Sequence, residues 1–240
     1  MMTLMRPIVK NAALASLILL GLIACGSDND DMEVTTPLPP APVNYTYEIT
    51  VTNLTNAQPL SPIAIALHQA GNFWVVGESA SNALEMLAEG GDNSALLADS
   101  SVIASATSTA PLGSGGRETL NVTIQDINDA KLTVATMLVN TNDAFTGVDA
   151  VSLASLSVGS SMSLYGNVFD SGTELNSEAI GTIPGPADSG EGFNKAREDT
   201  GFVSMHPGVV SMDDGLTGSV LSAAHKFDNP AIMVKVTRLE

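Results

Sequence analysis

Residues 45–52 read YTYEITVT, with an aromatic or aliphatic side chain at every odd position and a polar one at every even position. A period of two places alternate side chains on opposite faces of a β-strand, one face against a core and the other toward water. Residues 120–125 (LNVTIQ) and 232–237 (IMVKVT) repeat the alternation. The pattern predicts antiparallel β-structure with one buried face.

Further strand candidates are residues 63–68, 131–140, 161–165 and 202–206. Residues 132–139 are apolar on both faces, which places this segment in the centre of a sheet. Two glycine-rich stretches indicate loops, at 104–116 and 181–200. Because strands lie near both ends of the region, we expect the terminal strands to pair. We therefore predict one all-β domain, residues 45–240, folded as an antiparallel β-sandwich.

One region departs from the β pattern. Residues 79–97 read SASNALEMLAEGGDNSALL, in which Ser81 is a candidate N-cap, two leucines share a face and Gly90 is a stop signal. A second short turn can begin at Asp92. We predict one or two short helices packed over an open end or edge of the sandwich.

The first 24 residues have the organisation of a secretory signal. Residues 1–10 carry Arg6 and Lys10 and no acid, and an apolar run follows over 12–24. The run is shorter than the roughly 20 apolar residues that a membrane-spanning helix needs. We predict that residues 1–24 are a signal peptide.

The segment that ends this run, LIACG at 22–26, resembles the lipobox of bacterial lipoproteins. The resemblance implies that the thiol of Cys25 is lipidated and that the signal peptidase cuts before it. In the sorting pattern of Gram-negative lipoproteins, an aspartate directly after the lipidated cysteine favours retention in the inner membrane. Residue 26 is glycine, so the resemblance implies an outer-membrane lipoprotein that faces the periplasm or the cell surface. The alternative is an ordinary cleaved signal followed by an incidental cysteine.

Residues 25–44 are acidic and then proline-rich, which predicts a semi-extended tether between the anchor and the domain. The whole chain has 9 basic and 26 acidic residues, a net charge of −17. Such a charge repels phosphate backbones, so we expect no nucleic-acid partner. With a single cysteine, there is no intrachain disulfide framework.

Four blocks, in order, resemble the spondin domain found in the amino-terminal half of F-spondin and in bacterial secreted proteins. The blocks are 59–62 with 65–68, 77–81 with 87–92, 142–147, and 169–174 with 183–186. The resemblance extends over residues 45–239. It implies an antiparallel β-sandwich, calcium binding, and adhesion to an extracellular protein or glycan.

The family's two calcium-binding acidic turns fall on Asp143, Asp170 and Glu174, which the resemblance implies as ligands of one calcium ion. Glu174 departs from the family, which has aspartate there, and Ala144 replaces an aromatic residue. Calcium takes 6–8 oxygen ligands, and two carboxylates four residues apart around Gly172 can both turn inward. The alternative is that these are turn residues that hydrogen-bond their own backbone.

Other constellations are weaker. The histidines, His68, His206 and His225, lack the spacing of a zinc helix, and no Gly-x-Ser-x-Gly motif is present. We expect no enzymatic activity and interpret the protein as a surface-anchored, calcium-binding module. The alternatives are a hydrolase with a cryptic Ser/His/Asp site and a purely structural envelope lipoprotein.

The anchor can be tested directly. Replacing Cys25 with serine removes the thiol that would carry the lipid, so Cys25→Ser is expected to abolish incorporation of radiolabelled palmitate and to leave the protein unprocessed or soluble. Continued labelling of the variant would show that the lipobox interpretation is wrong.

Overall fold

The computed structural model describes residues 38–240, of which 41–240 form one compact unit. The predicted signal peptide (1–24), Cys25 and most of the predicted tether lie outside the described residues. Residues 38–43 are exposed and lack regular structure before the first strand begins at Asn44. Within the described range, no helix has the length and hydropathy needed to cross a bilayer.

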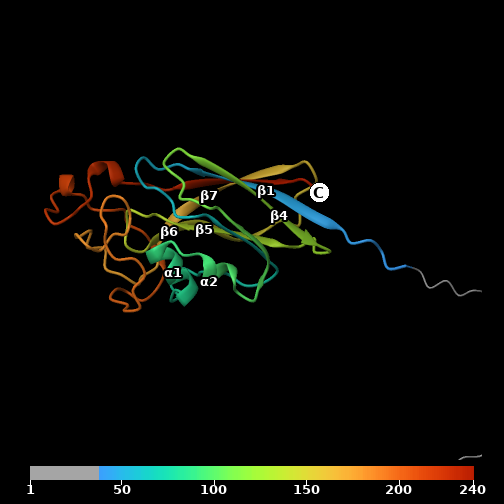
Figure 1. Ribbon diagram of the computed structural model, residues 1–240, viewed down its shortest axis with the longest axis horizontal. Coiled ribbons are helices and arrows are strands. Elements are labelled where there is room, and N and C mark those ends of the chain that lie inside the picture. The colour runs from blue at the N-terminus through green and yellow to red at the C-terminus, as the bar shows by residue number, and fades with distance from the viewer. Residues whose placement is uncertain (1–37) are drawn as a thin grey trace, which may run out of the picture. The chain divides into compact units, whose positions relative to one another are not determined.

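Nine strands make up a single antiparallel sheet in this part of the chain (Figure 1). They are β1 (Asn44–Asn53), β2 (Ala64–His68), β3 (Val102–Thr107), β4 (Arg117–Gln125), β5 (Lys131–Met137), β6 (Ala144–Ser152), β7 (Ser161–Asp170), β8 (Ser204–Met205) and β9 (Ile232–Arg238). Their order across the sheet is β3-β2-β5-β6-β7-β9-β1-β4, and β8 pairs with β7. The all-β, antiparallel prediction is confirmed.

The sheet folds into two layers because β7 belongs to both. Its first part, 161–166, pairs with β9, whereas its last part, 167–170, pairs with β6. Gly166 lies at the changeover, where a Cβ atom would stand 2.8 Å from the Gly147 carbonyl oxygen and 2.6 Å from the Ile232 side chain. Only glycine allows this close approach of the backbones without displacing a neighbour.

The core fills the space between the layers, and all nine residues predicted to face it from the alternation are at most 3 % exposed. These are Tyr47, Ile49, Val51, Val122, Ile124, Val134, Leu138, Val234 and Val236. The predicted pairing of the terminal strands is also confirmed, since β1 pairs with β9 from Tyr47–Arg238 to Asn53–Ile232. β5 is central, between β2 and β6, as its two apolar faces require.

Two strands were not predicted. The start of β6 overlaps the turn that the resemblance implied around Asp143, and β3 lies partly in the predicted loop 104–116. The first five residues of β6 are all buried, so they show no polar alternation, and β3 contains small side chains that give a weak apolar signal. The predicted strand at 202–206 is reduced to the two residues of β8.

Residues 38–240 contain two short α-helices, α1 (Asn82–Gly90) and α2 (Ser94–Leu97). The Leu84 amide donates to the Ser81 hydroxyl oxygen at 3.1 Å, so Ser81 is the N-cap, and Gly91 ends α1 in the left-handed conformation. The helices were predicted to cover an open end or edge of the sandwich, and this prediction is wrong. They cover the outer face of β2, β5 and β6, because these strands are apolar on both faces (Figure 1).

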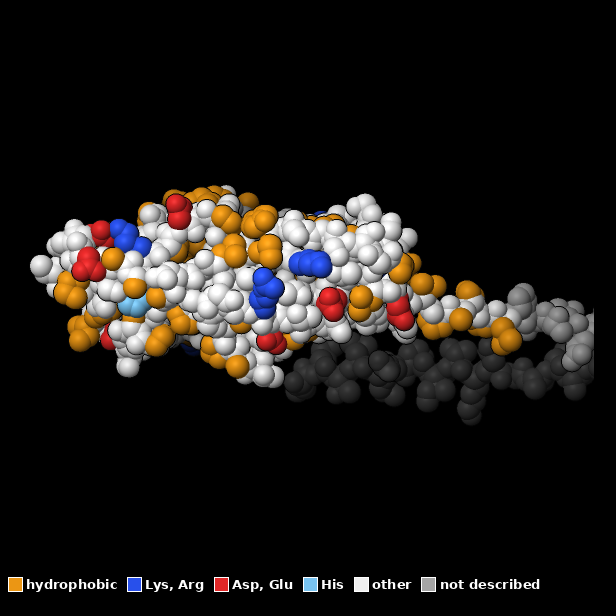
Figure 2. Space-filling view, turned by 90° about the horizontal axis from the view of Figure 1, so that it is seen from above, with side chains coloured by type: hydrophobic (Ala, Val, Ile, Leu, Met, Phe, Trp, Pro, Cys, Tyr) orange, Lys and Arg blue, Asp and Glu red, His pale blue; other side chains and the backbone are white. Residues whose placement is uncertain are grey.

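The long segment between β7 and β9 consists mainly of loops, with two single-turn 3₁₀ helices, η1 (Met212–Asp214) and η2 (Ala223–His225). Several apolar side chains of this segment are exposed: Leu175, Ile180, Val210, Met212 and Leu216. Figure 2 shows apolar side chains gathered at this end of the domain, and few charged groups over a largely uncharged surface.

The two-layer core can be tested with Leu132, which is fully buried in β5. Leu132→Ala is expected to lower the free energy of unfolding by about 2–5 kcal/mol, through lost burial and a residual cavity. Leu216→Ala, at a site that is 36 % exposed, is the control and is expected to change it much less. Equal effects in urea unfolding would contradict the assignment of the core.

Candidate metal centre

Asp143 lies directly before β6 and is fully buried. Its Oδ2 atom accepts hydrogen bonds from the Ser171 hydroxyl at 3.0 Å, the Thr173 amide at 3.0 Å and the Glu174 amide at 3.2 Å. The Asp143 turn and the 170–174 turn were predicted to converge on one ion, and these bonds join them. One carboxylate oxygen thus organises the loop that follows β7.

Asp170 ends β7 opposite Ala144 and is 3 % exposed. Its Oδ1 accepts from the Gly172 amide at 2.7 Å, and its Oδ2 accepts from the Asn176 side-chain amide at 2.6 Å. These are the local bonds expected of a turn-forming aspartate. Because each carboxylate oxygen has a second lone pair, the same bonds leave Asp170 able to contact a cation.

Glu174 is half-buried and lines an open cavity of about 170 Å³. Glu191 and Glu198 line the same cavity, together with Asn142 and Asn194. Burial, and then the charges of Glu89 and Asp143, raise the pKa of Glu174 to about 8. The Glu174 carboxylate therefore lies in a cavity lined by other acidic side chains, where its charged form is disfavoured.

The Asp143 carboxylate is disfavoured as an anion for similar reasons. Burial, and then the neighbouring Asp170 charge, raise the pKa of Asp143 to about 7 despite the hydrogen bonds from the loop. Its Oδ1 atom is buried and has no hydrogen-bond partner among the described residues. An unpaired buried oxygen of this kind is costly unless a proton or a cation satisfies it.

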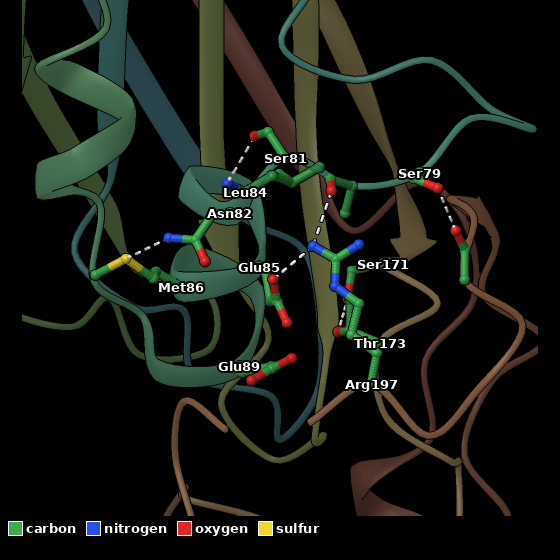
Figure 3. Close-up of polar contacts among 12 residues, drawn as sticks. Ser79, Ser81, Asn82, Leu84, Glu85, Met86, Glu89, Ser171, Thr173 and Arg197 are labelled. Atoms are coloured by element: carbon green, nitrogen blue, oxygen red, sulfur yellow. Dashed lines mark hydrogen bonds and ion pairs between the residues drawn. The ribbon is translucent and has the colours of Figure 1, made fainter. Parts of the chain in front are cut away.

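Helix α1 adds two buried carboxylates that the sequence analysis did not assign to the site. Glu85 pairs with Arg197 at 2.5 Å, and Glu89 Oε2 accepts from the Asn194 amide at 2.8 Å. Figure 3 shows both glutamates projecting from α1 toward the loop that carries Thr173. Their spacing of four residues, which puts them on one helix face, was the available signal.

The residues fit a hard cation in chemistry, because every candidate donor is an oxygen and one of them is an unpartnered buried carboxylate oxygen. Within residues 38–240, however, no three His, Cys, Asp or Glu side chains stand together as a ready ligand group. Calcium binding by Asp143, Asp170 and Glu174 therefore stays a prediction. It requires the carboxylates to turn toward a common point.

The histidines of the described region have separate surroundings. His68 Nε2 lies 2.9 Å from the Thr133 hydroxyl, which donates to Asp149. Nδ1 of His206 accepts from the Gly208 amide, and Nδ1 of His225 accepts from the Ser222 amide.

The comparisons with known proteins add no assignment. No model of a protein family matches the chain, and no curated protein sequence matches it. The resemblance to the spondin domain thus rests on the sequence blocks alone.

The raised pKa values predict how stability depends on pH. The folded protein keeps protons on Asp143 and Glu174 that the unfolded chain has already released, since their ordinary values are 3.8 and 4.5. In a chelator, the contribution of these groups to the free energy of unfolding is therefore largest at low pH. It falls as the pH rises and is lost once the pH passes about 7 and about 8.

Urea unfolding between pH 4.5 and pH 9 would measure this slope. The double variant Asp143→Asn, Glu174→Gln cannot ionise at these positions, so its stability is expected to fall less steeply over the same range. An identical slope for the variant and the wild type would contradict the raised pKa values.

Proposed function

We propose that the protein is a lipid-anchored envelope protein whose β-sandwich domain binds one calcium ion and acts as an adhesion or extracellular binding module. Asp143, Asp170 and Glu174 are the proposed ligands, and Cys25 carries the proposed lipid. The partner is an unidentified protein or glycan, and contact with the membrane is through the anchor only.

The observation that supports calcium most strongly is the unpartnered Oδ1 of Asp143, a fully buried carboxylate next to a second buried acid, Asp170. A divalent cation would satisfy the oxygen and cancel the repulsion between the two carboxylates. Calcium suits this position because it accepts 6–8 oxygens in irregular geometry, including backbone carbonyls and water.

The proposed role of the ion is to fix the loops at this end of the domain. The loop after β7 is held to Asp143 by hydrogen bonds to a single oxygen. Without a cation, the clustered negative charge opposes the same arrangement. Extracellular modules typically bind calcium with dissociation constants of about 10⁻⁴–10⁻³ M.

The adhesion part of the proposal rests on the anchor, the tether and the resemblance to the spondin domain. A domain that begins at Asn44 behind a predicted tether of about 20 residues can stand clear of the membrane surface. The exposed apolar side chains of the segment between β7 and β9 offer contact area for a partner.

Calcium should stabilise the folded protein, because an ion that binds only the native state shifts the unfolding equilibrium. The gain is about 2.7 kcal/mol at a hundredfold excess over the dissociation constant. Asp143→Asn is expected to remove most of the gain, measured as the difference in melting temperature between calcium and chelator.

Asp228→Asn, which removes one exposed acidic charge outside the site, is the matched control and should keep the full calcium response. A wild-type melting temperature that is the same in calcium and in chelator would contradict the proposed function.

A further inference from the structure

Helix α1 directs two buried glutamates toward the loop after β7. Each has a buried Oε1 atom without a partner among the described residues, but only Glu85 is paired with a cation. Glu85 is neutralised by Arg197, whose Nη2 atom also donates to the Ala80 carbonyl oxygen at 2.9 Å. Glu89 lies one turn further along the same face and is 1 % exposed. Among the described residues, no basic side chain forms a salt bridge with Glu89.

The two carboxylate oxygens of Glu89 also differ. Oε2 accepts a hydrogen bond from the Asn194 amide, whereas Oε1 is buried and has no partner within residues 38–240. Asn194 lines the cavity that contains Glu174, so the bonded oxygen is held by the wall of that cavity. The unpartnered oxygen is left without the hydrogen bond that a buried carboxylate needs.

Thr173 links Glu89 to Asp143. The Thr173 hydroxyl lies 3.4 Å from Asp143 Oδ2. Burial raises the pKa of Glu89, and the nearby Thr173 side chain offsets part of that rise. Glu89 and Asp143, each with one buried unpartnered oxygen, therefore flank the same threonine side chain. In Figure 3 the Glu89 carboxylate points from α1 into the space beside this loop.

Glu174 completes the group. After burial, the charge of Glu89 is the largest cause of the raised pKa of Glu174, ahead of the charge of Asp143. Glu174 therefore experiences the charges of two carboxylates that come from two other segments, helix α1 and the turn before β6. Glu89 and Asp143 each carry an oxygen that no group within residues 38–240 satisfies.

We propose, on the basis of the calcium function proposed above, that Glu89 is a further carboxylate ligand of the same cation, reaching it from α1. The site then takes oxygens from the turn before β6, from the loop after β7 and from the helix layer. Binding of the ion fastens α1 to the loops across the end of the sheet. With a high count of carboxylates, the site favours calcium over magnesium, which keeps most of its water.

The test compares calcium affinity by calorimetry in the wild type, Glu89→Gln and Glu85→Gln. Glutamine keeps the shape of the side chain and an oxygen that can accept a hydrogen bond from the Asn194 amide. It is uncharged, and an NH₂ group that cannot bind a cation replaces the second oxygen. Glu89→Gln is expected to raise the dissociation constant by at least about tenfold. Glu85→Gln, on the same helix face with the same change in charge, is expected to raise it by less than about threefold.

A second readout separates a ligand from a residue that only positions the loop. The luminescence lifetime of bound europium in H₂O and in D₂O reports the number of water molecules on the ion. Loss of one carboxylate ligand in Glu89→Ala should add about one or two water molecules, because a carboxylate supplies one or two oxygens. A purely structural role would lower affinity without changing this number.

The outcomes distinguish the two proposals. A wild type that binds neither calcium nor europium overturns the proposed function and, with it, the role of Glu89. A wild type that binds both, with unchanged affinity and unchanged water count in the Glu89 variants, overturns the role of Glu89 alone. If Glu85→Gln and Glu89→Gln weaken calcium binding equally and the number of bound water molecules does not change, the effect is one of general negative charge. This result would also overturn the role of Glu89 as a ligand.

Discussion

The buried carboxylate of Asp143 is the interaction on which the functional end of the domain depends. It draws the loop after β7 against the start of β6 through hydrogen bonds to one oxygen, and its other oxygen has no partner among the described residues. A buried anion in this state must take up a proton or a cation. The raised pKa of Asp143, the crowding with Asp170 and the proposed calcium ion are consequences of this single placement.

The fold creates that placement through β7. Because β7 passes from one layer to the other, its last residues pair with β6 and deliver Asp170 and the 171–174 loop to Asp143. The helices then cover the outer face of the same layer and bring Glu89 to the loop. The architecture thus assembles acidic groups from three distant parts of the sequence, and their mutual repulsion is what a cation would relieve.

The strands β1, β4 and β9 each have one face exposed to solvent. They were predictable because polar and apolar side chains alternate along them. β6 was not, because helices cover its second face and remove the polar half of the pattern. Asp143 and Asp170 were found through the resemblance of two turns, and the structure places them next to each other. Glu89 was missed because helical spacing reveals which side chains share a face but not which loop that face meets.

A crystal structure grown with a lanthanide in place of calcium would test the central claim most directly, because anomalous scattering locates the ion independently of any assumed ligands. We expect one strong peak within about 2.3–2.6 Å of Asp143 Oδ1, enclosed by the acidic loops. Peaks confined to exposed carboxylates such as Asp213, with Asp143 Oδ1 still unpartnered, would contradict it.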